Sequence, residues 1–136
     1  MKTHKIWVLA GLSIIFLMAC TSETLAPATG SLDIKVTIGP LCPVEPCKKT
    51  AEEFRQIYES YSFVITNPKD KSVVLEQKLS YNGTNGLLKS NSIAVGEYEL
   101  NLKPESFFTK RGFPKTVIIE KDKTTTMEID IDTGIR

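Results

Sequence analysis

The chain has almost no histidine or tryptophan, with one residue of each, and both stand near its start, at His4 and Trp7. The remainder therefore has no histidine for a Ser-His-Asp or Cys-His catalytic site or for a histidine-containing zinc site. Serine, threonine and tyrosine are plentiful, but the sequence identifies no base beside them that would activate a hydroxyl. We therefore expect a protein that is not an enzyme and that holds no cofactor and no catalytic metal.

The chain also lacks a strong charge of either sign and a long apolar run. Its 17 basic and 16 acidic residues give a formal net charge of +1 at pH 7, which does not favour nucleic acid as a partner. An uncharged stretch runs from Ile6 to Ala19. A helix of that length rises roughly 21 Å at about 1.5 Å per residue, which is short of the ~30 Å of a bilayer's hydrocarbon core.

The order of residues around this stretch is typical of a secretory signal. Lys2 and Lys5 precede the apolar run, and the small residue Ala19 stands directly before Cys20. The tetrad Leu17-Met18-Ala19-Cys20 resembles the lipobox of bacterial lipoproteins, whose peptidase cleaves before a cysteine that carries a diacylglyceryl group. We expect residues 1–19 to be a lipoprotein signal peptide and Cys20 to be the lipidation site. A retained transmembrane helix and plain secretion are the alternatives.

A lipid anchor predicts where the protein resides. Two or three acyl chains, at about 0.8 kcal/mol per buried methylene, hold a protein stably on a membrane that it does not cross. The resemblance thus implies the cell envelope, with the membrane as a partner through the anchor. Thr21 follows the cysteine where an inner-membrane retention signal has Asp, which implies the outer membrane or the cell surface if the host has an outer membrane.

Residues 20–30 are mostly small, polar or proline, which predicts a flexible tether after the lipidated cysteine. Residues 31–136 are enough for one domain. Cys42 and Cys47 remain as an even pair in an oxidising compartment, which favours a disulfide over free thiols. Their C-x4-C spacing differs from the C-x-x-C of redox sites and offers too few ligands for a metal.

The domain region alternates apolar and polar residues with the period of half-buried strands. Turn-forming residues separate the alternating segments, for example Asn82-Gly83 and Asn85-Gly86. The predicted strands are 32–38, 61–65, 72–79, 87–91, 96–102, 115–120 and 124–132. Short strands at this spacing with hardly any helix predict an all-β fold, a seven-stranded antiparallel Ig-like sandwich, with a barrel as the alternative.

One short helix is expected directly after the first strand. Thr50 and Glu53 have the spacing of a capping box, and Phe54, Ile57 and Tyr58 then fall on one helical face. We expect two to three turns lying over an end of the sheet. A single turn followed directly by strand is the alternative.

Three segments of the domain resemble small exported prealbumin-like domains, which are grouped with carboxypeptidase regulatory-like and transthyretin-like sandwiches. The segment from Val36 to Glu45, together with Cys47, resembles the start of these domains. Val95-Gly96-Glu97-Tyr98-Glu99-Leu100 is similar to their Pro-Gly-x-Tyr strand start with Val95 in the proline position, and Ile131 to Arg136 is similar to their closing sequence. The resemblance implies an exported seven-stranded sandwich that often serves as an accessory module, and it transfers no catalytic residue.

Two groups of residues are candidates for binding. Phe107, Phe108 and Phe113 stand among Lys110 and Arg111 in the long connection 104–114. Exposed, they would form an aromatic and basic binding patch, whereas tucked inward they would close one end of the sandwich. Glu128, Asp130 and Asp132 share one strand face at about 6.6 Å spacing. A straight strand face diverges, whereas calcium needs converging oxygens, which favours a solvated acidic face over a metal site.

These features predict a membrane-anchored exported lipoprotein that acts as a non-catalytic interaction or structural accessory module. Another envelope protein or a glycan is the expected partner. The alternative is a periplasmic protein that binds calcium or a small ligand in a pocket at the strand ends.

Overall fold

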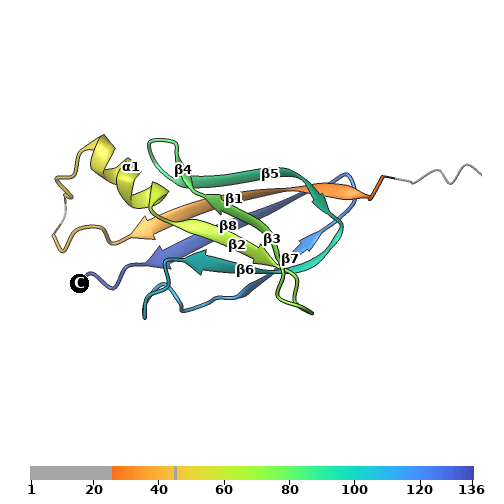
Figure 1. The fold of residues 1–136 in the computed structure, drawn as a ribbon. Coiled ribbons are helices and arrows are strands. Elements are labelled where there is room, and N and C mark those ends of the chain that lie inside the picture. Colours follow the sequence, from red (N-terminus) through yellow and green to blue (C-terminus); the bar gives the residue numbers. More distant parts are fainter. Residues whose placement is uncertain (1–25, 45) are drawn as a thin grey trace, which may run out of the picture.

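The computed structural model describes residues 26–44 and 46–136; the predicted signal peptide and lipidation site Cys20 lie outside these residues. The described chain forms two four-stranded sheets with one helix after the first strand (Figure 1). The elements are β1 (Thr29–Gly39), α1 (Ala51–Glu59), β2 (Ser62–Thr66), β3 (Val73–Lys78), β4 (Ser80–Tyr81), β5 (Gly86–Ala94), β6 (Gly96–Lys103), β7 (Lys115–Ile119) and β8 (Thr124–Asp132). The all-β sandwich with a short helix after its first strand is thereby confirmed.

The two sheets have the strand orders β4-β5-β1-β8 and β3-β2-β6-β7. Leu32, Ile34, Val36 and Ile38 of β1 are all buried, as their alternation with polar residues predicts. Each sheet turns such a row of apolar side chains toward the other sheet, and the two rows form the core. Burying one aliphatic or aromatic side chain stabilises the fold by about 1.5–3 kcal/mol, so this core is the main source of stability.

Two details of the predicted sandwich are corrected. The described chain has eight strands rather than seven, because residues 80–81, expected in a loop, form the short strand β4 against Gly86 and Leu87. The sheets are not antiparallel throughout, because β8 pairs with β1 in parallel over the whole of Ser31 to Gly39. Alternation of side chains shows which face of a strand is buried but is the same for both pairing directions, so the sequence pattern could not reveal this parallel pair.

The sandwich is linked along both of its long sides by side chains that donate to backbone carbonyls of the other sheet. On one side the Gln77 amide nitrogen lies 3.3 Å from the Lys89 carbonyl oxygen. On the other side the Thr125 hydroxyl lies 2.6 Å from the Ile118 carbonyl oxygen. The strand ladders themselves stay in two separate sheets, so the barrel alternative is wrong.

Helix α1 begins with the predicted capping box. The Glu53 amide donates to the Thr50 hydroxyl at 3.2 Å, and the Thr50 amide donates to the Glu53 carboxylate at 2.7 Å. This backbone hydrogen bond from Thr50 lowers the pKa of Glu53. The helix has nine residues, so the single-turn alternative is wrong. Tyr58 faces inward, accepts a hydrogen bond from the Ile38 amide at 3.2 Å, and stacks on Tyr81 with ring centroids 4.8 Å apart.

The start of β6 is fixed by Tyr98. Its hydroxyl donates to the Ala94 carbonyl oxygen at 2.8 Å, across the corner that joins β5 to β6. A Cβ on Gly96 would lie 3.3 Å from this hydroxyl, so the glycine leaves room for the ring. This arrangement is similar to the tyrosine corner of Ig-like sandwiches, and it explains why glycine and tyrosine occur together in the Val95 to Leu100 motif.

Candidate functional site

The two ends of the sandwich differ in what they carry. At the end that we call the tether end, β1 begins at Thr29 beside the 94–96 and 120–123 connections. The opposite end, which we call the loop end, carries residues 40–44 and 46–48, helix α1, the 82–85 and 104–114 connections and the C-terminal residues 133–136 (Figure 1). The predicted aromatic and basic patch and the Cys42–Cys47 disulfide both lie at the loop end.

The three phenylalanines of the 104–114 connection do not act as one patch. Phe113 packs against the core, with its ring centroid 6.0 Å from that of Phe63. Phe108 is half-buried, whereas Phe107 is 73% exposed, and their rings meet edge to face at 87° with centroids 5.3 Å apart. Phe113 therefore closes the end of the sandwich, whereas Phe107 is presented to solvent.

The two basic residues of the predicted patch also differ. The Arg111 guanidinium carbon lies 5.0 Å from the centroid of the Phe107 ring and 5.8 Å from that of Phe108, which is the geometry of a cation–π contact. Lys110 instead forms an exposed ion pair with Glu105 at 3.5 Å. Phe107, Phe108 and Arg111 thus form one cluster, which we call the aromatic–arginine cluster, and Phe113 and Lys110 lie outside it.

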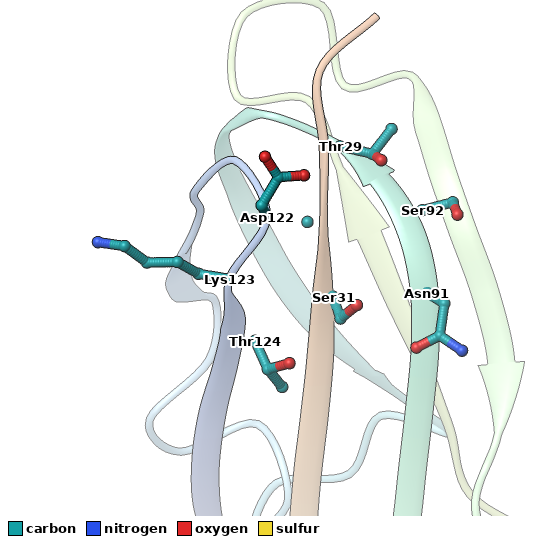
Figure 2. A pocket seen from close by; sticks show the side chains of 8 residues that line it. Thr29, Ser31, Asn91, Ser92, Asp122, Lys123 and Thr124 are labelled. Carbon is teal, nitrogen blue, oxygen red and sulfur yellow. The ribbon is translucent and has the colours of Figure 1, made fainter.

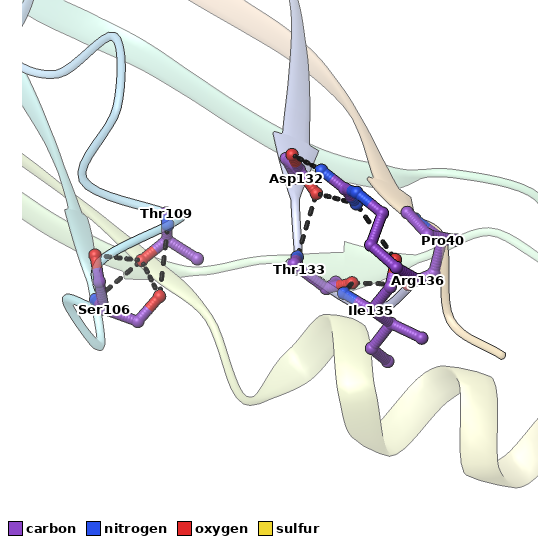
Figure 3. A network of polar contacts seen from close by, with 8 residues as sticks. Pro40, Ser106, Thr109, Asp132, Thr133, Ile135 and Arg136 are labelled. Carbon is purple, nitrogen blue, oxygen red and sulfur yellow. Dashed lines mark hydrogen bonds and ion pairs between the residues drawn. The ribbon is translucent and has the colours of Figure 1, made fainter. Parts of the chain in front are cut away.

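A pair of hydroxyl residues that the sequence analysis did not single out holds this connection in shape. The Ser106 amide donates to the Thr109 hydroxyl at 2.7 Å, and the Thr109 amide donates to the Ser106 hydroxyl at 3.1 Å (Figure 3). Thr109 is only 4% exposed, whereas Ser106 is exposed, so these contacts are partly buried. The turn at residues 107–112 begins between these two residues and carries Phe107 to Arg111, and the Ser-x-x-Thr spacing is the signal that could have predicted it.

Residues 132–136, which we call the C-terminal strap, lie between β1 and the aromatic–arginine cluster. The Asp132 carboxylate accepts hydrogen bonds from Arg136 at 2.7 and 3.1 Å and from the Gly134 amide at 2.8 Å (Figure 3). The Arg136 hydrogen bond is the main cause that lowers the pKa of Asp132 to about 2. The Thr133 hydroxyl donates to the Pro40 carbonyl oxygen, which ties the strap to the end of β1.

The strap also positions Phe108. Gly134 has φ of +77°, and a Cβ placed on it would lie 2.3 Å from the Phe108 ring. Only glycine combines this backbone conformation with so close an approach. The strap therefore packs against Phe108 of the aromatic–arginine cluster. Gly134 of the predicted closing sequence and Phe108 of the predicted patch are thus in contact.

A hollow of about 390 Å³ also opens at the loop end, between β1, helix α1 and the 82–85 connection. Phe54, Tyr58 and Tyr81 supply aromatic walls, and Pro40 and Cys47 border it. The Cys42–Cys47 disulfide, predicted from the cysteine count, is present with a Cα–Cα distance of 5.4 Å.

A second hollow, of about 280 Å³, lies at the tether end and is lined mainly by hydroxyl, amide and backbone groups (Figure 2). Asp122 is its one acidic residue, and the Lys123 side chain points away toward Glu120, with which it pairs at 3.0 Å. The hollow lies at strand ends, which is where the alternative function places a small-ligand pocket. Asp132, the last residue of the acidic strip on β8, lies at the other end of the sandwich, so the strip and the pocket do not combine into one site.

The acidic strip is partly matched by positive charges. Glu128 lies 3.4 Å from the Lys35 amine on the neighbouring strand, and Asp132 pairs with Arg136. Within residues 26–44 and 46–136, no three side chains of the types that bind metals gather into a site. In the same described region, no helix has the length and apolarity required to cross a bilayer.

Comparisons with known proteins were made with both the sequence and the structure. No protein-family model matches the sequence, and no curated protein matches it. Among solved structures, the crystal structure of GBS52, the minor pilin of the Gram-positive pathogen Streptococcus agalactiae, is similar at 17% sequence identity with a TM-score of 0.49. The likeness covers 78% of this chain and 45% of the pilin chain, so this chain spans less than half of the pilin's length.

Proposed function

We propose that this chain is a lipoprotein of the cell envelope, anchored through Cys20, whose sandwich is a non-catalytic interaction module that binds its partner at the loop end. The separation of the two ends of the domain supports this function most directly. The tether would join the domain at Thr29, whereas the exposed Phe107 and Val44, which are 73% and 74% exposed, belong to loop-end connections. A strand as long as β1 spans roughly 35 Å. An anchored domain would thus hold these side chains away from its own membrane.

The size of the tether is compatible with this arrangement. A flexible linker of about ten residues has a mean end-to-end distance of roughly 17 Å. It would let the domain tilt but would keep the tether end nearer the membrane. The outer membrane or cell surface is the proposed location in a host with an outer membrane, and another envelope protein or a glycan is the proposed partner.

We also propose that the domain is of the prealbumin-like kind. Each of the three resembling segments contains a local contact that shapes a turn or a chain end at the edge of the sandwich. The first runs from β1 into the disulfide loop, the second contains Tyr98 with its hydrogen bond to Ala94, and the third contains the strap residues Asp132 and Arg136.

The anchor is tested by Cys20→Ala in cells that are fed a labelled fatty acid. We expect the label to disappear from the protein and the uncleaved precursor to accumulate. The matched control is the Cys42→Ser and Cys47→Ser double variant, which removes the other two cysteines and should keep the label. Labelling that persists in Cys20→Ala would disprove the anchor.

The interaction surface is tested by placing a photo-crosslinking amino acid at exposed positions of the anchored protein in its native membrane. Val44 and Phe107 represent the loop end, and Val95, which is 45% exposed, represents the tether end. We expect crosslinked products from position 44 or 107 and not from position 95. Products from position 95 alone, or none from either loop-end position, would contradict the proposed function.

A further inference from the structure

We propose that the aromatic–arginine cluster binds an extended segment of a partner protein in which an acidic residue and an apolar residue stand two positions apart. This inference rests on the proposed function, because it takes the loop end to be the interaction surface. The Arg111 guanidinium would bind the carboxylate, and Phe107 would contact the apolar side chain.

Arg111 is held in place but keeps its hydrogen-bond donors available. It is exposed and stacked on Phe107, and within the described residues its guanidinium has no hydrogen-bond acceptor and no carboxylate within 4.0 Å. Its charge contributes to lowering the pKa of Asp132, but the oxygens of that carboxylate already accept hydrogen bonds from Arg136 and Gly134. A guanidinium is weakly hydrated and binds carboxylates through two parallel hydrogen bonds, so an incoming carboxylate suits this group.

Among the described residues Arg111 forms no ion pair, whereas two cations near it do. Lys110 has Glu105 at 3.5 Å, and Arg136 has Asp132 at 2.7 Å. Lys115 lies 5.7 Å from the centroid of the Phe113 ring, beside the core rather than beside Phe107. Charge complementarity therefore favours a partner with negative charge opposite Arg111.

The spacing within the cluster fits an extended peptide. The Arg111 guanidinium carbon is 5.0 Å from the centre of the Phe107 ring. In an extended strand, residues i and i+2 point to the same side about 6.6 Å apart. A partner segment with an acidic residue at i and an apolar residue at i+2 can therefore reach both groups at once.

The same geometry disfavours a glycan or a lipid as the partner. Phe107 meets Phe108 edge to face at 87° and lies under Arg111, so the two rings do not form the flat platform on which a sugar stacks. The start of β1, where the tether would join, is at the opposite end of the sandwich, so the cluster would face away from the anchoring lipids.

The test uses the full-length anchored protein with a benzoyl-phenylalanine crosslinker at position 107, and the products are mapped by mass spectrometry. We expect peptides that carry Asp or Glu within about two residues of the crosslinked position. In Arg111→Met the yield should fall about tenfold, and Arg111→Lys should restore only part of it, because an ammonium group lacks the planar fork. Lys110→Met, which removes the neighbouring charge, should keep the yield within about twofold because that charge is exposed and already paired.

Each contrary result has a distinct meaning. An unchanged yield in Arg111→Met, products on lipid or glycan, or peptides without acidic residues would overturn this inference while leaving the loop end as an interaction surface. Absence of products at position 107 with products retained at position 44 would also overturn it. Absence at both positions would overturn the proposed function itself.

Discussion

The start of β1 at the tether end and the connections of the loop end are held by different kinds of contact. At the tether end, backbone groups hold the start of β1, since the Asp122 amide donates to the Thr29 carbonyl at 2.9 Å and the Ser31 amide donates to the Lys123 carbonyl at 2.8 Å. At the loop end, side chains hold the connections through the capping box, the disulfide, the Ser106 and Thr109 pair and the C-terminal strap. Backbone contacts depend little on residue identity, whereas these side-chain contacts depend on it completely.

This difference has a functional consequence. The backbone contacts at the start of β1 can position the domain on its tether without requiring particular side chains. An end whose connections are held by particular side chains can present groups such as Phe107 and Arg111 in a fixed arrangement. Surface loops on a rigid scaffold commonly carry binding function for this reason.

The largest effect is expected from Gly30→Ala at the tether end. The added Cβ would lie 2.2 Å from the Glu120 carbonyl oxygen and 2.9 Å from a methyl carbon of Ile119. Backbone atoms cannot move aside as a flexible side chain can, so we expect a loss of about 3 kcal/mol in the free energy of unfolding, measured by denaturant titration.

The control for this prediction lies at the other end of the same strand. A Cβ on Gly39 would meet no atom within 4 Å. Gly39→Ala should therefore change the free energy of unfolding by no more than about 0.5 kcal/mol. Equal effects of the two substitutions would refute the contrast between the two ends.

The next largest effect is expected from Gly134→Ala in the C-terminal strap. The substitution places alanine at φ of +77° and its Cβ against the Phe108 ring. We expect a loss of about 2 kcal/mol, and changes of the amide chemical shifts of Phe107 and Arg111 in a two-dimensional NMR spectrum.

Gly83→Ala separates the effect of backbone strain from the effect of the contact with Phe108. Gly83 has φ of +100°, but a Cβ there would meet no atom within 4 Å. We expect a loss of about 1 kcal/mol from backbone strain alone and no shift changes in the 104–114 connection. If Gly134→Ala left the Arg111 resonances unchanged, the strap would not position the aromatic–arginine cluster.

A smaller effect is expected from Thr50→Ala, which removes the capping hydroxyl of α1. Such substitutions cost about 1 kcal/mol. Because α1 belongs to the loop end, amide hydrogen exchange should accelerate in residues 51–54 and remain unchanged in β1. Thr50→Ser keeps the hydroxyl and should behave as the unsubstituted protein. Faster exchange in β1 would show that the cap supports the whole sandwich rather than one end.

The sequence was informative where the physics is local. Alternation in residues 32–38 predicted the buried face of β1, the Thr50 and Glu53 spacing predicted the helix start, and the count of cysteines predicted the disulfide. Each of these inferences depends on residues that lie near one another in the chain.

The sequence was not informative about contacts between segments that are far apart in the chain. The parallel pairing of β1 with β8 joins the first strand to the last, and no local pattern encodes it. The same holds for the candidate site. The sequence placed Phe107, Phe108 and Phe113 in one connection, but their separation into an exposed ring and a core ring depends on where Phe63 and Gly134 lie in the fold.

The smallest effect is expected from protonation of Asp132. Hydrogen bonds from Arg136 and then from Gly134 lower its pKa from 3.8 to about 2. A carboxyl group whose pKa is lower in the folded state stabilises the fold above its unfolded pKa and loses that contribution as the pH falls through the folded value. The midpoint of urea unfolding should therefore fall less steeply between about pH 4 and pH 2 in Asp132→Asn than in the unsubstituted protein.

Asp130→Asn on the same strand face, which removes a carboxylate that has no ion pair in the described chain, is the matched control and should keep the original slope. An unchanged slope in Asp132→Asn would mean that the strap is held at Thr133 and Gly134 rather than by the Asp132–Arg136 pair.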